Sequence, residues 1–63
     1  MDNEMKKISD MTELYNKLQE MWWKLKHDNN AHTDGVKGYE RVDVTANYYA
    51  MQTLEKVMEM IEV

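Results

Sequence analysis

The residues best suited to chemistry lie together in a polar stretch near the middle of the chain, residues 27–35. This stretch holds both histidines of the chain and two aspartates, which are residue types that bind metal ions. It matches parts of the twelve-residue calcium loop, including a glycine at the sixth position, Gly35. However, Arg41 then falls at the twelfth position, where that loop requires a bidentate glutamate. A zinc site from His27, His32 and one carboxylate is a second hypothesis, but ordinary polar loop composition explains the same residues.

Catalytic chemistry has less support from the sequence. The chain has no cysteine, and its only serine, Ser9, is joined to His27 and His32 by no known motif. There is no glycine-rich phosphate loop, and a protein of 63 residues has little room for an enclosed pocket. We therefore expect a protein that is not an enzyme and that uses no cofactor or metal.

The elements that must position these residues are two amphipathic segments, one on each side of the polar stretch. In both segments apolar residues recur at steps of three and four, which predicts one apolar stripe on each of two helices. The first stripe consists of Met11, Leu14, Tyr15, Leu18, Met21, Trp22 and Leu25. The second consists of Val44, Tyr48, Met51, Leu54, Met58 and Ile61. The predicted fold class is all-α, a single antiparallel helical hairpin.

Capping signals give the expected boundaries of the helices. Asp10 begins a capping-box pattern, which predicts a first helix over about residues 10–28 with a possible extension toward the N-terminus. Asn29-Asn30 is taken as its stop signal, and residues 29–42 as a connecting loop that holds both glycines. Asp43 or Thr45 is expected to cap a second helix over about residues 43–62, similar in length to the first.

The width of the stripes predicts self-association. Each stripe is three positions wide in a heptad description, so two helices packed together would leave apolar flanks in water. A chain this short also buries little core, and without cysteines it has no disulfide to compensate. We therefore expect a homodimer that forms a four-helix bundle. The expected contact residues are Met11, Leu14, Leu18, Met21, Trp22, Leu25, Tyr48, Met51, Leu54, Met58 and Ile61.

Composition narrows the class of partner. The net charge of the chain is −4, so the chain lacks the cluster of basic residues that binding to nucleic acid or to an anionic membrane requires. No apolar run is long enough for a transmembrane helix, and no signal peptide is visible at the N-terminus. We expect a cytoplasmic protein that binds neither DNA, RNA nor membranes directly.

Four residues outside the stripes form the predicted contact patch for another protein. Trp23 and Tyr49 fall at the heptad position that faces away from the seam, and tryptophan and tyrosine are enriched at interface hot spots. His27 and Tyr39 complete the predicted patch near the loop end. The competing interpretation is that the loop or the dimer covers Trp23.

The functional hypothesis is a small regulator or inhibitor that binds a target protein through these aromatic residues. One alternative is a structural or assembly subunit with no separate ligand site. Another is an acidic decoy that mimics nucleic acid, for which Asp43, Glu55, Glu59 and Glu62 provide the charge.

Overall fold

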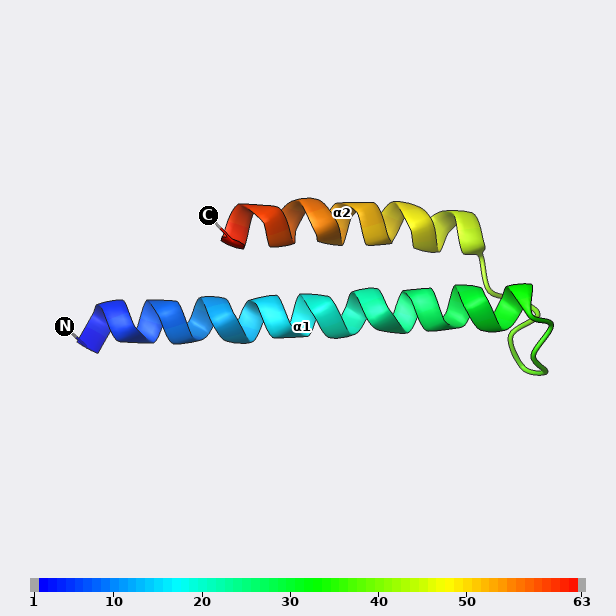
Figure 1. Ribbon diagram of the computed structural model, residues 1–63, viewed down its shortest axis with the longest axis horizontal. Helices are drawn as coiled ribbons and strands as arrows, with labels where there is room; N and C mark the ends of the chain where they lie inside the picture. Colours follow the sequence, from blue (N-terminus) through cyan, green and yellow to red (C-terminus); the bar gives the residue numbers. More distant parts are fainter. Residues whose placement is uncertain (1, 63) are drawn as a thin grey trace.

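Two antiparallel helices form a hairpin, as the sequence predicts (Figure 1). The computed structural model describes the backbone of residues 2–62 and the side chains of residues 10–61. Helix α1 spans Asp2–Thr33 and helix α2 spans Val44–Glu62. The hairpin is elongated, with extents of 51 × 18 × 13 Å. It is therefore one layer of two helices, and each helix faces solvent except where it contacts the other helix or, at the end of α1, the loop.

Helix α1 does not stop at Asn29-Asn30, so the predicted end of the first helix and start of the loop were wrong. The helix continues to Thr33, and Gly35 follows with a positive φ of 75°. The amide of Val36 donates to the carbonyl of Ala31 at 2.9 Å, and the amide of Gly35 donates to that of His32 at 3.1 Å. This pair of bonds is the Schellman motif, for which glycine is the preferred residue. The stop signal is therefore Gly35, and the asparagines before it are helical.

The connection between the helices is shorter than predicted, residues 34–43, and its backbone is held by several bonds. A carboxylate–amide contact closes one turn, since both oxygens of Glu40 accept from the amide of Gly38 at 3.0 and 3.1 Å. Nδ1 of His32 lies 2.8 Å from the carbonyl oxygen of Tyr39, which ties the loop to the end of α1. The loop ends at Asp43, whose Oδ1 accepts from the amide of Ala46 at 3.0 Å. Asp43 is thus the N-cap of α2, one of the two caps predicted.

The two helices are unequal, which corrects the expectation of matched lengths. Helix α1 has 32 residues and α2 has 19, or roughly 48 Å against 28 Å at 1.5 Å per residue. The side chains of Trp22 and Glu55 meet, and so do those of Asn29 and Asn47. In this antiparallel register the C-terminal end of α2 lies opposite about residue 15 of α1. The N-terminal part of α1 therefore extends past α2 (Figure 1).

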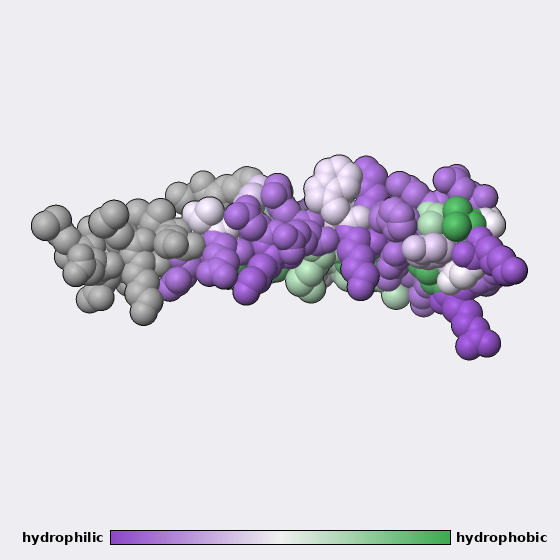
Figure 2. All heavy atoms as spheres, turned by 90° about the horizontal axis from the view of Figure 1, so that it is seen from below, coloured by the Kyte–Doolittle hydropathy of each residue, from purple (hydrophilic) through white to green (hydrophobic). Residues whose placement is uncertain are grey.

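The core of the hairpin is small. Among the described residues only Ala31, Met51 and Leu54 are buried apolar residues, and no large side chain is fully buried. The one buried polar residue in the described part of the chain is Asn29, with 3% of its surface exposed. On the side of α1 turned away from α2, the surface is mainly hydrophilic, with hydrophobic atoms along one edge and at the loop end (Figure 2). A single hairpin therefore encloses little apolar volume.

Candidate protein-contact surfaces

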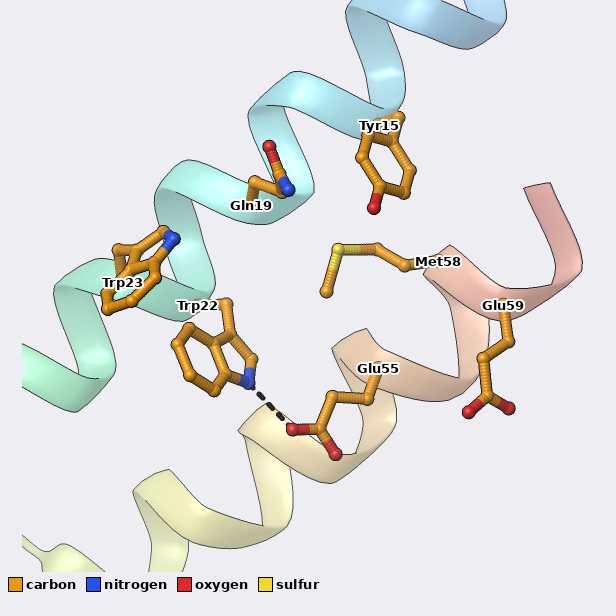
Figure 3. A pocket seen from close by; sticks show the side chains of 7 residues that line it. All are labelled: Tyr15, Gln19, Trp22, Trp23, Glu55, Met58 and Glu59. Carbon is orange, nitrogen blue, oxygen red and sulfur yellow. Dashed lines mark hydrogen bonds between the residues drawn. The ribbon is translucent and has the colours of Figure 1, made fainter. Parts of the chain in front are cut away.

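One long side of the hairpin carries a groove that is centred on the pair Trp22 and Glu55. The indole Nε1–H of Trp22 donates to Oε1 of Glu55 at 3.0 Å, which links α1 to α2 across the side of the hairpin. A hollow of about 330 Å³ lies on one side of this bond (Figure 3). Its lining residues are Tyr15, Gln19, Trp22, Trp23, Glu55, Met58 and Glu59. Tyr15, Trp22 and Met58 point toward the space between the helices, so the floor of this hollow is aromatic and apolar (Figure 3).

A second hollow, of about 310 Å³, lies on the loop side of the same hydrogen bond. Its lining residues are Trp22, Lys26, Asn29, Asn30, Tyr48, Met51, Gln52 and Glu55. Because Trp22 and Glu55 line both hollows, the two form one interrupted depression along this side. We call this depression the aromatic groove.

Trp23 is at the rim of the aromatic groove, and the loop does not cover it. Its side chain is 59% exposed, and its ring packs edge-on against Trp22 with the ring centroids 4.8 Å apart. The ammonium of Lys26 lies 5.1 Å from the Trp22 centroid and 5.4 Å from that of Trp23. These are cation–π distances, and at an exposed site such a contact contributes about 0.5–1 kcal/mol. The two rings are therefore ordered by each other and by one cation.

The other residues of the predicted contact patch lie in different places. His27 and Tyr39 come together, with ring centroids 5.8 Å apart, where the loop returns along α1. Tyr49 is 68% exposed on α2 and lines neither hollow of the groove. It follows Tyr48, which does line the groove, and successive helical residues point about 100° apart. Among the described residues no side-chain contact joins Trp23, Tyr49 and the His27–Tyr39 pair into one surface.

The opposite long side of the hairpin is apolar. Two rows of four residues share the spacing 4-3-4, which places each row on one face of its helix. The rows are Leu14, Leu18, Met21 and Leu25 on α1, and Ala50, Leu54, Val57 and Ile61 on α2. In an antiparallel pair the two rows turn to the same side, away from the groove. We call these eight residues the apolar flank.

The apolar flank divides the predicted self-association residues into two groups. Leu18, Leu25 and Ile61 are half-buried and Leu54 is buried, because they border the contact between the helices. Leu14 and Met21 remain 48% and 54% exposed. The remaining predicted contact residues lie outside the flank: Met51 is buried between the helices, Trp22, Met58 and Tyr48 line the groove, and Met11 lies in the part of α1 that extends past α2.

The residues of the polar stretch that suggested a metal site instead make contacts within the hairpin and its loop. Among the described residues no group of three or more histidine, cysteine, aspartate or glutamate side chains is close enough to hold a metal ion. His32 contacts the loop carbonyl of Tyr39, and Nδ1 of His27 lies 3.5 Å from Oδ1 of Asp28. The hydrogen bonds from the Gly38 amide lower the pKa of Glu40 below its usual value, and its own amide and His32 act in the same direction.

Sequence reasoning named Glu55 and Glu59 only as charges of an acidic decoy, and it missed both their place in the groove and the role of Asn29. Glu55 and Glu59 stand on the polar side of their helix, where a solvated position is the ordinary expectation. Only the register between the helices places Glu55 against Trp22. Asn29 had a visible signal, because it continues the 4-3-4 spacing of Leu18, Trp22 and Leu25. Its residue type, which is common in turns, outweighed that spacing in the prediction.

Within the described residues, neither helix combines the length and the apolar character needed to cross a lipid bilayer. No known protein family, curated protein or solved structure matches this chain.

Proposed function

We propose that this chain is a non-enzymatic protein-interaction module, a regulator or inhibitor that dimerises through its apolar flank and offers its aromatic groove to a target protein. The observation that carries the proposal is the apolar flank, on which Leu14, Met21, Ala50 and Val57 are exposed. Soluble monomers seldom leave a continuous apolar row exposed on two adjacent helices. Here both helices carry the row with the same spacing.

The surface area of the hairpin supports a second copy as the occupant of the flank. The chain exposes 5500 Å² at a mass of 7.6 kDa. A compact monomer of that mass exposes about 4,300 Å², so the hairpin carries an excess of roughly 1,200 Å², to which both the flank and the part of α1 that extends past α2 contribute. A standard protein interface buries about 800 Å² on each partner, which this excess can supply. Packing two flanks face to face places the α1 row and the α2 row of both copies in one shared core, as in a four-helix bundle.

The two surfaces do not compete, because they lie on opposite long sides of the hairpin. A dimer that closes on Met21 and Val57 leaves Trp22, Trp23 and Glu55 open on each copy. The dimer therefore presents two equivalent grooves. In this arrangement the paired flanks stabilise the fold of both copies, and the two grooves remain available to bind the target.

A scan of single cysteines tests the dimer, since the natural chain contains none. Cysteine is placed singly at Leu14, Met21, Ala50 and Val57, and each variant is oxidised with glutathione disulfide. In a two-fold dimer that closes on the flank, the flank positions nearest the axis lie close to their symmetry mates, so we expect stronger disulfide cross-linking within the flank than outside it. Asn16 and Lys56, which are exposed and outside the flank, are the control positions. Equal cross-linking at flank and control positions would contradict the proposal.

A further inference from the structure

The first hollow of the aromatic groove carries negative charge. Glu55 and Glu59 line it together with three aromatic rings, and none of the described lysine or arginine residues lines it. Glu55 is held in place by the indole of Trp22, which donates to one carboxylate oxygen. Glu59 has no hydrogen bond or ion pair with any described residue and points outward one turn further along α2 (Figure 3). Two carboxylates therefore stand beside an aromatic floor without a cation between them.

The tryptophans of the groove already attract a cation from their own chain. The Lys26 ammonium lies within 5.4 Å of both ring centroids, which shows that the pair offers its π-faces to positive charge. Lys26 approaches from the loop side and lines the second hollow, whereas the two carboxylates line the first. Trp22 also lines the first hollow, where the carboxylates of Glu55 and Glu59 supply negative charge. The first hollow therefore has space and charge for a second cation beside Trp22.

We infer that this hollow binds an arginine side chain presented by a segment of the target protein. A guanidinium group is planar, stacks on aromatic rings and donates to carboxylates in a fork, so it can use Trp22, Glu55 and Glu59 together. A lysine ammonium lacks the planar face, and an acidic or phosphorylated segment would be repelled by the two carboxylates. This inference rests on the proposed function, because it names the chemistry of the target that the module binds.

The test uses a minimal arginine probe and the two tryptophan indole signals of the protein. N-acetyl-arginine methylamide is titrated into the ¹⁵N-labelled full chain at constant ionic strength, and the indole N–H resonances of Trp22 and Trp23 are followed. The matched control ligand is N-acetyl-citrulline methylamide, which has nearly the same shape but no charge. The expected result is a saturable shift of the Trp22 indole signal with arginine and no saturable shift with citrulline.

Three variants locate the binding. Glu55→Gln keeps an acceptor for the Trp22 indole but removes the charge, and Glu59→Gln removes the second charge. Each is expected to weaken arginine binding roughly two- to fivefold, the range of exposed charge pairs. Glu20→Gln removes an exposed charge on α1 outside the groove and is expected to leave binding unchanged. If all three variants weaken arginine binding equally, binding depends only on the net charge of the protein, and the inference is overturned.

Two other outcomes would also overturn it. Equal shifts with arginine and citrulline would show that the hollow does not select a cation. A Trp22 signal that depends on protein concentration but not on arginine would assign the groove to a second copy of the chain. The cysteine scan tests dimerisation separately from the arginine titration. If one of the two proposals fails, the other can therefore still be tested.

Discussion

The side-chain amide of Asn47 donates to the side-chain carbonyl of Asn29 at 2.9 Å, across the interface between the two helices. Asn29 is the one buried polar residue among those described, and its own amide lies 3.9 Å from the sulfur of Met51. An apolar stripe can slide by a turn against another stripe at little cost, but a buried amide pair is satisfied in one register only. The pair therefore fixes which residues of α1 and α2 meet, including Trp22 and Glu55.

Removal of this amide pair is expected to destabilise the fold. Asn47→Ala leaves the Asn29 carbonyl with no partner at a buried position, and the expected loss is about 1–3 kcal/mol of unfolding free energy. Urea denaturation followed by circular dichroism measures it. Asn29→Ala and the double variant complete a thermodynamic cycle. Strictly additive losses would show that the two asparagines do not act as a pair.

Much of this architecture was predictable because it depends on local patterns. The 3-4 spacing of apolar residues gave two helices, and Asp43 gave the start of α2, since capping requires only a few neighbouring residues. The end of α1 was misplaced because Asn29 was interpreted by residue type and Gly35 was not interpreted as a helix cap. The groove was not predictable, because contacts such as Trp22 with Glu55 depend on the register between helices and not on either helix alone.

The cap of α2 contributes to stability on its own. Asp43→Ala removes the carboxylate that accepts from the Ala46 amide, and the expected cost is about 0.5–2 kcal/mol. Asp43→Asn keeps an acceptor and is expected to recover most of that loss. The measurement is the thermal unfolding midpoint of the natural chain, Asp43→Ala and Asp43→Asn at equal chain concentration. Identical midpoints would mean that the cap is not required.

Trp23 is expected to matter for recognition and little for folding. Because 59% of its surface is exposed, Trp23→Ala should change the unfolding free energy by no more than about 0.5–1 kcal/mol. Binding of a target protein should be lost, as tryptophan side chains carry much of the energy of protein interfaces. Denaturation and far-ultraviolet circular dichroism measure the first effect. A collapse of helicity in this variant would instead make Trp23 a structural residue.

The loop is expected to depend on pH through Glu40. Hydrogen bonds from the Gly38 amide lower the pKa of this carboxyl in the folded chain. A depressed folded-state pKa means that the contribution to stability is complete above the unfolded-state pKa and is lost as the pH falls through the folded-state value. The Gly38 amide resonance should follow the same acidic transition. In Glu40→Gln that transition should disappear, and its persistence would contradict the assignment.

The apolar flank can be tested by adding one negative charge to it. Met21→Asp places a carboxylate where the dimer should exclude water, whereas Asn16→Asp adds the same charge at an exposed position outside the flank. We expect Met21→Asp to lower dimer affinity at least tenfold and Asn16→Asp to have little effect. Sedimentation equilibrium measures both. Equal behaviour of the two variants would remove the flank as the dimer interface.

The most direct test of dimerisation through the flank is the solution mass of the natural chain over a dilution series, measured by sedimentation or light scattering. We expect a folded species of twice 7.6 kDa that dissociates only on dilution, with loss of helicity as the flank loses its partner. A folded monomer of 7.6 kDa at every concentration would contradict it. The apolar flank would then have to be a docking face for a different protein.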